Sequence, residues 1–282
     1  MTGKTVLITG TSSGIGLETA LGAARAGWRV VATMRDTGGA GALQEAAAAA
    51  GVAGRIEVRR LDVTEPASVQ ECVAGVVADH GALHALINNA GAGHVGTLEV
   101  DGVEAARRVM EVNYFGVLNA TAAALPHLRA SGGRVLAVTS VGGVVGQPFN
   151  EAYCAAKFAV EGYLEALAPV AATVGVGVTL IEPAAVASEF VANAGIPDDR
   201  AALEQRLGPY APAMNAYLAR TANAYAGAQS AHDAAAVIVA ALTAEHPPLR
   251  IQTSDQARSF SALKLADPDG SKVLAMTSAW VA

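Results

Sequence analysis

Residues 9–27 read TGTSSGIGLETALGAARAG, a glycine-rich turn between the apolar run KTVLITG (4–10) and an alanine-rich helical pattern. Gly10 suits a tight turn, while Gly14 and Gly16 let the backbone and the helix approach a pyrophosphate closely. The N-terminus of the predicted helix offers unpaired N–H groups and a partial positive charge to that anion. The stretch therefore predicts the first βα unit of a dinucleotide-binding sheet, with a plain glycine turn as the alternative.

The same alternation of strand and helix continues along the chain. Short β-branched runs that are apolar on both faces alternate with longer alanine-rich helical stretches, which is typical of a parallel sheet covered on both sides. We expect one α/β domain over residues 1–282, a Rossmann-type doubly wound parallel sheet of about seven strands with helices on both faces. The predicted strands span 4–10, 28–33, 55–62, 83–91, 133–140, 175–183 and 249–253, and the predicted helices lie near 14–26, 40–50, 66–80, 101–130, 151–173 and 231–245.

Two segments break this rhythm, residues 184–230 and the tail 254–282. The first follows the carboxyl end of a strand, where open α/β sheets bind ligands, and loops of this length are usually functional or disordered. We therefore predict that residues 184–230 form a substrate lid within the single domain. The large side chains of this segment either line an apolar pocket or form a small core of the lid itself. They are Tyr210, Met214, Tyr217 and Tyr225.

The composition argues against several classes of protein. Hydrophobic residues make up 52% of the 282 residues and charged residues 16%, so disorder is not expected. The net charge is −6 and no run of Lys or Arg occurs, so we expect no nucleic-acid binding and, without a long apolar window, no membrane span. Cys72 and Cys154 do not resemble a disulfide framework, which favours a reducing, cytoplasmic location. The histidines show no metal-ligand spacing, so no metal is expected.

A phenol and an ammonium occur four residues apart in YCAAK (153–157). Residues i and i+4 share one helix face, so Tyr153 and Lys157 can meet. A phenol with a pKa of about 10 is a poor base at neutral pH, but the positive charges of Lys157 and of an oxidised nicotinamide should lower that pKa. Ser140, at the end of a predicted strand, can hold a substrate oxygen and stabilise developing charge. Taken singly, the pair could be surface neighbours and Ser140 a turn residue.

The spacing TGxxxGxG is similar to that of the short-chain dehydrogenase/reductase family, and the resemblance covers most of the chain. NNAG (88–91) resembles the family motif that supports the sheet and the adenosine side of the cofactor. LDV (61–63) resembles the segment whose Asp contacts adenine, and NYFG (113–116) carries the helix Asn of the family. Ser140, Tyr153 and Lys157 stand in the order and spacing of the family's reacting residues.

The segment EPAAVASEF (182–190) resembles the family motif beside the nicotinamide, with Ala184 in place of Gly and Ser188 in place of Thr. Ser188 can still offer a hydroxyl to the carboxamide. The resemblance implies four catalytic residues, in which Asn113 supports a proton relay, Ser140 holds the substrate oxygen, Tyr153 is the acid/base, and Lys157 tunes Tyr153 and binds the ribose. It implies that the cofactor contacts Gly10, Ser12, Ser13, Gly14, Ile15, Gly16, Arg35, Asp62, Val63, Asn89, Ala90, Gly91, Tyr153, Lys157, Pro183, Val186 and Ser188.

The residues at the end of the second predicted strand, VVATMRD (30–36), indicate which of NAD(H) and NADP(H) the protein prefers. NAD-preferring relatives have an acidic residue at the position of Met34, which bonds the ribose hydroxyls and would repel a 2′-phosphate. Here the neutral Met34 is followed by Arg35, which can bind a phosphate through two parallel hydrogen bonds, and Ser12 can add a hydroxyl. We expect NADP(H) rather than NAD(H). The alternative for Arg35 is a solvated side chain paired with Asp36.

Three stretches resemble the branch of the family that holds the 17β-hydroxysteroid and retinol dehydrogenases: VVATMRD (30–36), SVGGVVGQPFNEAYCAAKFAVEG (140–162) and ADPDGSKV (266–273). The resemblance implies hydride transfer between NADP(H) and a ketone or secondary alcohol, with a bulky or lipophilic substrate expected. The alternatives are an epimerase or dehydratase on the same scaffold, and a regulatory protein that senses the cofactor. The intact Ser, Tyr and Lys argue against both.

The resemblance also implies a homodimer or homotetramer, because helices near 103–130 and 152–172 pack against a second subunit in such families. Both predicted helices have apolar faces, although a monomer needs the same faces to cover its own sheet. His94 follows the fourth predicted strand. It either lines the substrate entrance or is a solvated loop residue.

Overall fold

The computed structural model describes residues 3–187, 199–267, 269 and 271–280. Its strands are β1 (Thr5–Thr9), β2 (Arg29–Met34), β3 (Ile56–Arg60), β4 (Ala85–Asn88), β5 (Arg134–Val138), β6 (Gly177–Glu182), β7 (Val186–Ala187), β8 (Gln229–Ser230) and β9 (Arg250–Gln252). Within the described residues, seven strands form one sheet in the order β3-β2-β1-β4-β5-β6-β9, and every neighbouring pair is parallel. The order reverses between β1 and β4, where doubly wound sheets bind ligands at the carboxyl ends of the strands. A short parallel pair, β7 with β8, stands apart.

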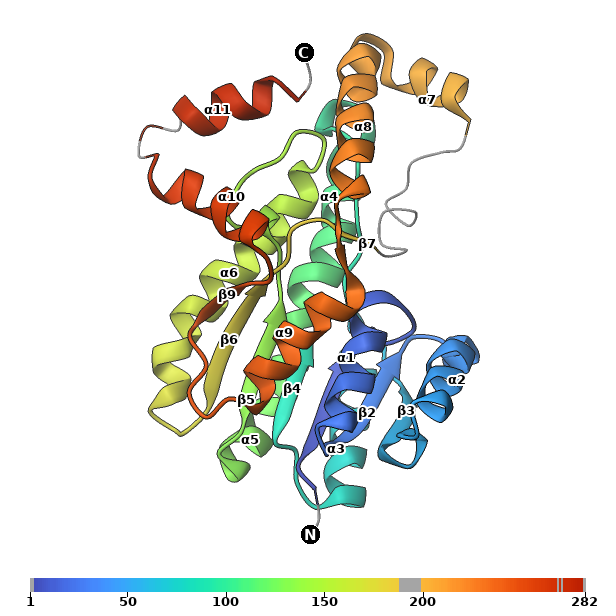
Figure 1. Cartoon of the computed structure of the whole chain (residues 1–282), viewed down its shortest axis with the longest axis vertical. Helices are drawn as coiled ribbons and strands as arrows, with labels where there is room; N and C mark the ends of the chain where they lie inside the picture. Colours follow the sequence, from blue (N-terminus) through green and yellow to red (C-terminus); the bar gives the residue numbers. More distant parts are fainter. Residues whose placement is uncertain (1–2, 188–198, 268, 270, 281–282) are drawn as a thin grey trace.

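Helices cover both faces of this sheet, which confirms the predicted Rossmann-type fold (Figure 1). They are α1 (Gly14–Arg25), α2 (Gly41–Ala49), α3 (Pro66–His80), α4 (Leu98–Met110), α5 (Gly116–Ser131), α6 (Glu151–Ala172), α7 (Arg200–Leu207), α8 (Ala211–Ala226), α9 (Ala231–Thr243), α10 (Asp255–Leu265) and α11 (Ser271–Ser278). Helix α1 packs beside α9 on one face, and α3 packs beside α5 on the other. None of the described helices is both long enough and apolar enough to cross a bilayer.

The apolar run of β1 explains why this strand lies at the centre of the sheet. Successive side chains of a strand point to opposite faces. Val6 and Ile8 accordingly join the cluster beneath α1, α2 and α9, while Leu7 joins the cluster beneath α3 and α5. All three side chains are fully buried. A strand that is apolar at every position therefore needs helices on both faces, which is what the alternating sequence provides.

The predicted helix near 101–130 is not continuous, so this prediction was wrong in its middle. Helix α4 ends at Met110, a π-helical turn spans Glu111–Phe115, and α5 begins at Gly116. Inside the turn, Asn113 Nδ2 donates a hydrogen bond to the carbonyl oxygen of Val109 at 3.1 Å. A side chain thus takes a carbonyl that would otherwise accept a backbone N–H, and the regular helix is interrupted.

The predicted lid, residues 184–230, contains β7, α7, α8 and β8, and Figure 1 shows α7 and α8 beyond the carboxyl ends of the strands. Of the two interpretations of its large side chains, a lid core holds for Met214 and Tyr217, which are both buried. They pack into a cluster separate from the two main ones and joined to the segment before α6. This lid cluster consists of Phe149, Leu203, Leu207, Met214 and Tyr217, with Tyr210 at its margin.

The tail after β9 forms α10 and α11, within the segment 254–282 that breaks the predicted alternation of strands and helices. Trp280 stacks on Phe260 with ring centroids 5.8 Å apart. The guanidinium of Arg220, on α8, lies 3.5 Å from the centroid of the Trp280 ring. Lys264 Nζ lies 4.2 Å from the Phe158 ring on α6. The tail is therefore attached both to the lid and to the helix that carries Tyr153.

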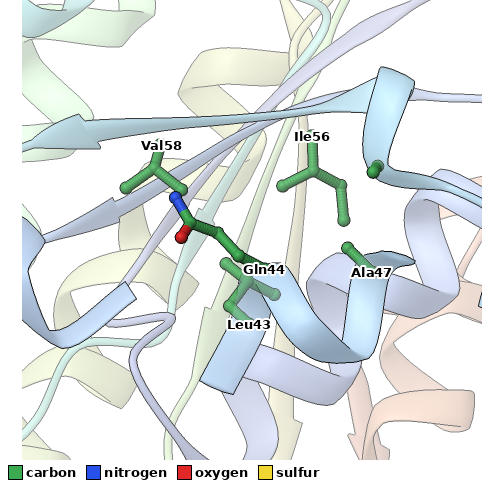
Figure 2. A pocket seen from close by; sticks show the side chains of 6 residues that line it. Leu43, Gln44, Ala47, Ile56 and Val58 are labelled. Carbon is green, nitrogen blue, oxygen red and sulfur yellow. The ribbon is translucent and has the colours of Figure 1, made fainter. Parts of the chain in front are cut away.

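One cavity of about 240 Å³ lies between α2 and the edge strand β3 (Figure 2). Its lining is apolar apart from a single amide, and none of the predicted site residues contributes to it. Strands β2, β1 and β4 separate it from β5 and β6. The lining residues are Leu43, Gln44, Ala47, Ala53, Ile56 and Val58.

Candidate active site

The turn between β1 and α1 brings backbone groups together at the predicted glycines. Gly10 and Gly14 have positive φ angles of 70° and 56°, a region that L side chains rarely adopt. A Cβ atom built on Gly16 would lie 2.1 Å from the carbonyl oxygen of Gly10 and 2.4 Å from Asn89 Nδ2. The backbone geometry therefore requires glycine at all three positions.

The N-terminus of α1 is open to an anion. Ser13 is its N-cap residue, yet the Ser13 side chain makes no capping hydrogen bond. The first N–H groups of the helix thus keep their capacity to bind a negatively charged group. Asn89 Nδ2 holds the turn in place by donating to the carbonyl oxygens of Thr9 at 2.9 Å and Gly10 at 2.8 Å. This cradle fits the pyrophosphate of a dinucleotide.

Further predicted cofactor contacts surround the cradle at the carboxyl edge of the sheet. Ile15 packs against the cluster beneath α1, α2 and α9, and the backbone N–H of Ala90 donates to Thr9 Oγ1 at 3.0 Å. Val63 is buried. Burial alone would raise the pKa of Asp62, but hydrogen bonds from Thr64 and the nearby arginine charges hold it below its usual range. Those charges belong to Arg35 and Arg60.

Arg35 does not pair with Asp36, so that interpretation of the sequence was wrong. Asp36 Oδ1 instead accepts a hydrogen bond from the Gly38 N–H at 2.8 Å and caps a short helical turn. Within the described ranges Arg35 makes no ion pair, and its side chain is exposed. Ser12 is exposed as well. Both polar groups are accessible beside the cradle.

Ser140, Tyr153 and Lys157 come together, as the sequence predicted from their spacing. The hydroxyls of Ser140 and Tyr153 are hydrogen-bonded, and Ser140 Oγ also accepts from the Gly142 N–H at 2.9 Å. Lys157 is buried, donates from Nζ to the Val138 carbonyl at 3.0 Å, and lies 5.8 Å from the centroid of the Tyr153 ring. Strand β5 thus positions Ser140, and one face of α6 positions the other two.

Burial dominates the electrostatics of this cluster in the polypeptide alone. Burial raises the pKa of Tyr153 above its usual range, despite the hydrogen bond from Ser140. Burial also lowers the pKa of Lys157 to about 8, against the charge of Glu161. The polypeptide by itself therefore keeps the phenol of Tyr153 protonated, because the loss of hydration on burial outweighs the hydrogen bond from Ser140.

Asn113 is buried and fully hydrogen-bonded to the backbone. Its Nδ2 donates to the carbonyls of Ala92, at 2.8 Å, and Val109, while its Oδ1 accepts from the Ala92 N–H at 3.1 Å. A Cβ atom built on Gly91 would lie 2.8 Å from Asn113 Oδ1 and 3.7 Å from Lys157 Nζ. Asn113 therefore joins the loop after β4 to the neighbourhood of Lys157.

The segment after β6 closes the same side of the site. The Pro183 carbonyl accepts a hydrogen bond from the Val141 N–H at 2.9 Å, next to Ser140. Ala184 does not adopt a positive φ angle, so the turn accommodates it in place of glycine. Val186 is buried in β7, and Ser188 lies outside the described residues.

A buried carboxylate behind the cluster was missed by the sequence analysis. Glu161 accepts hydrogen bonds from Thr139 Oγ1 at 2.5 Å and from Arg250 Nε at 3.0 Å. Burial raises its pKa in spite of the hydrogen bond from Thr139. Glu161 lies four residues after Lys157, so the rule that places i and i+4 on one helix face could have found it.

Two other side chains near Tyr153 were not assigned to the site from the sequence. A Cβ atom built on Gly142 would lie 3.3 Å from each of Gln147 Nε2, Ser140 Oγ and Tyr153 Cε1. Tyr225, on α8, is close enough to raise the pKa of Tyr153 further. The Gln147 position carries no periodic signal, because it lies in an irregular loop.

Histidine and cysteine side chains contribute no metal centre within the described parts of the chain, where no suitable group of ligands occurs. His94 is partly buried and its Nε2 lies 3.5 Å from Asp101 Oδ2, so it is not a solvated loop residue. Burial raises the pKa of the Cys154 thiol to about 11, which keeps this neighbour of Tyr153 protonated and unreactive.

Comparison with known sequences agrees with this geometry. The family model of the short chain dehydrogenases matches residues 4–199. Retinol dehydrogenase 8 from Bos taurus is 38% identical over 280 residues, which cover 95% of this chain and 87% of the relative. The 17-beta-hydroxysteroid dehydrogenase type 1 of Homo sapiens is 38% identical over 273 residues, which cover 94% of this chain and 82% of the relative.

Solved structures with the same fold contain either nicotinamide cofactor. A short chain dehydrogenase/reductase from Burkholderia phymatum in complex with NAD matches with a TM-score of 0.77 and 25% identity, covering 94% of each chain. Actinorhodin polyketide ketoreductase, solved with NADPH, matches with a TM-score of 0.73 and 26% identity, covering 89% of this chain and 95% of that one. This chain belongs to the short-chain dehydrogenase/reductase family of oxidoreductases, in the branch of the retinol and 17β-hydroxysteroid dehydrogenases.

Proposed function

We propose that the protein transfers hydride between NADP(H) and a ketone or secondary alcohol. One observation carries the proposal: the hydroxyls of Ser140 and Tyr153 are hydrogen-bonded beside the buried Lys157. This cluster lies at the carboxyl edge of the sheet, after β5, which is the neighbour of β4. A hydroxyl pair of this kind can hold a carbonyl oxygen and deliver a proton to it.

In the reductive direction, Tyr153 is the proton donor. Its raised pKa keeps the phenol protonated until substrate arrives, which suits a general acid. The Ser140 hydroxyl holds the substrate oxygen while negative charge develops on it. When bound, the nicotinamide supplies the hydride to the carbonyl carbon. Lys157 anchors the ribose, and its ammonium stabilises the phenolate that remains after proton transfer.

Asn113 has a supporting role in this proposal. Its three side-chain hydrogen bonds hold the π-helical turn open, and such a turn leaves a backbone carbonyl outside the regular helical ladder. A carbonyl released in this way can bind a water that returns a proton to the site. Asn113 acts through the backbone and does not touch the substrate.

The preference for NADP(H) rests on the groups beside the cradle. Arg35 is exposed and makes no ion pair within the described residues, so it can offer a charged fork to a 2′-phosphate, and the exposed Ser12 can add a hydroxyl. Met34, with no charge, does not compete for the ribose hydroxyls. Of the other predicted contacts, we assign the glycine turn to the pyrophosphate. We assign Asp62 and the loop after β4 to the adenosine, and the segment after β6 to the nicotinamide.

A bulky or lipophilic substrate fits a single catalytic domain with a lid over residues 184–230. The names of two relatives, a retinol dehydrogenase and a 17-beta-hydroxysteroid dehydrogenase, support this class. Tyr225 from the lid lies near Tyr153, so the lid borders the reacting residues.

Cys72 and Cys154 are buried thiols that form no disulfide bond, which suits a reducing compartment such as the cytoplasm.

We also infer self-association into a homodimer or homotetramer. Large apolar side chains remain exposed on α6 and on the π-helical turn before α5, where a second copy of the chain would cover them. Phe115 and Tyr163 are each 43% exposed, and Val170 is 63% exposed.

The test of the proposed function is turnover of a panel of ketones and secondary alcohols, followed by nicotinamide absorbance. Tyr153→Phe should lower kcat by about 10²–10⁴-fold, the usual contribution of general acid–base catalysis. Tyr163→Phe removes a phenol from the exposed face of the same helix and should leave kcat unchanged. NADPH binding should persist in both variants. Wild-type turnover by Tyr153→Phe, or no redox turnover of any substrate by the wild type, would overturn the proposal.

A further inference from the structure

The Gln147 amide lies at the reacting cluster. A Cβ atom built on the buried Gly142 would lie 3.3 Å from Gln147 Nε2, and equally far from Ser140 Oγ and Tyr153 Cε1. Three groups on different segments thus surround the small space that a Gly142 side chain would fill. A substrate whose oxygen contacts Ser140 must pass close to the Gln147 amide.

The amide of Gln147 also differs from the other polar groups of the site in its bonding. Asn113 is bonded to Ala92 and Val109, and Lys157 to Val138. By contrast, neither polar side-chain atom of Gln147 makes a hydrogen bond within the described part of the chain; its hydrogen bonds there are made by the backbone, to the Asn150 N–H at 3.1 Å and to the Cys154 thiol. A carboxamide offers two donors and two acceptor positions, so its whole capacity remains for a ligand.

The loop around Gln147 is held firmly on both sides. Val145 is fully buried, and Phe149 is buried in the lid cluster with a φ angle of 58°. Asn150 Nδ2 donates to Tyr217 Oη at 2.5 Å and to the Pro148 carbonyl at 3.0 Å. A recognition group on such a fixed segment can discriminate between substrates, because little ordering is needed when the substrate binds.

We propose that Gln147 is a specificity-determining residue, whose amide binds a second polar group of the substrate two carbons from the reacting carbonyl. The inference rests on the proposed carbonyl reduction and names its substrate class: ketones with a hydroxyl or carbonyl oxygen at the β position. A ketone with only hydrocarbon at this position would displace the water from the Gln147 amide without replacing the hydrogen bonds between the amide and water. That loss weakens substrate binding.

The experiment compares pentan-2-one with 4-hydroxybutan-2-one, in which a hydroxyl replaces the terminal methyl group. The wild type should prefer the hydroxyketone about tenfold in kcat/KM, since a hydrogen bond lost at an amide that the substrate covers costs on the order of 1.4 kcal/mol. Gln147→Leu, of similar size but without hydrogen-bonding groups, should bring this ratio close to one. The change should come mainly from a higher KM for the hydroxyketone.

Gln44→Leu is the matched control, because it makes the same exchange at the cavity beside α2 (Figure 2), which strands β2, β1 and β4 separate from β5 and its following Ser140. It should keep the wild-type ratio. The inference is overturned if the wild type reduces both ketones without preferring the hydroxyketone, or if the preference survives in Gln147→Leu; either result leaves the proposed function intact. A wild type that reduces no carbonyl compound at all overturns the proposed function and this inference together.

Discussion

The cofactor cradle, between β1 and α1, and the lid helices α7 and α8 lie at the same edge of the sheet, yet they are held in different ways. The cradle is shaped by backbone contacts, with Gly16 against the Gly10 carbonyl and the amide of Asn89 bridging to the end of β1. Directly beneath it are the fully buried side chains of β1, which belong to the two main clusters.

The lid has a small core of its own, centred on Leu207 and Tyr217. The cation–π contact between Arg220 of the lid and Trp280 of the tail supports it further. Few buried side chains hold it, so it should open at a lower free energy than the sheet. The comparison teaches that the proposed cofactor site rests on the main core of the sheet, while the segment that we propose to cover the substrate has a smaller core and can change independently.

The largest expected effect tests whether the lid is an independent unit. Leu207→Ala removes a side chain that is 2% exposed, which should cost about 2–5 kcal/mol of local stability. Hydrogen exchange should increase in α7 and α8, and the KM of bulky ketones should rise, while the Kd of NADPH stays the same. Leu265→Ala, at a side chain that is 80% exposed, is the control. Equal loss of protection in β1 would show that lid and sheet unfold together.

A second change breaks the cradle instead. Gly16→Ala places a methyl group 2.1 Å from the Gly10 carbonyl, so backbone must move, at a cost of about 1–3 kcal/mol. NADPH binding, measured by fluorescence titration, should weaken by about tenfold or more, since 1.4 kcal/mol corresponds to tenfold. Gly39→Ala serves as the control, because nothing lies within 4 Å of a Cβ atom at that position. An unchanged Kd would mean that the close approach is not needed for the cofactor.

The next change sharpens the cofactor assignment without disturbing the fold. Arg35→Asp replaces an exposed cation with an anion, which would lose the paired hydrogen bonds to a 2′-phosphate and repel it. The ratio of the NADPH and NADH dissociation constants should shift toward NADH by about tenfold or more, as charged hydrogen bonds contribute roughly 1.5–3 kcal/mol. Arg25→Asp, exposed at the far end of α1, should not alter the ratio. A constant ratio in both variants would remove Arg35 from cofactor selection.

The smallest effect concerns the contact between tail and lid. Trp280→Ala removes the ring above which the Arg220 guanidinium lies, an interaction of about 0.5–2 kcal/mol. The substrate KM should rise a few-fold and the NADPH Kd should not change. Trp280→Phe retains an aromatic ring and should behave almost like the wild type. A shift in the NADPH Kd with constant KM would contradict the assignment of this contact to the substrate end.

Much of the fold could be predicted because its signals are local. Each of the seven strands of the sheet lies within or next to its predicted range, since β-branched runs and glycine turns report directly on backbone conformation. The prediction failed at 111–115, where the side chain of Asn113 competes for a carbonyl of the helix. It was also incomplete in the tail, where α10 and α11 have little periodic pattern and are held by contacts to distant residues.

The predicted reacting residues lie close together for the same reason. The spacing of Tyr153 and Lys157 places both on one face of a helix, whatever surrounds them. Their titration behaviour was not predictable, because it depends on burial by residues from several segments. The sequence suggested that Lys157 and an oxidised nicotinamide together lower the pKa of Tyr153, whereas burial in the polypeptide alone raises it.

By itself, therefore, the sequence determined the order of strands and helices, the glycine cradle and the positions of Ser140, Tyr153 and Lys157, since each depends on residues that are neighbours along the chain or one helical turn apart. Tertiary structure alone decided that Gln147 borders the hydroxyls of Ser140 and Tyr153, and that the predicted lid has its own core. Those facts depend on which distant segments pack together, and on the water that their packing removes from particular side chains.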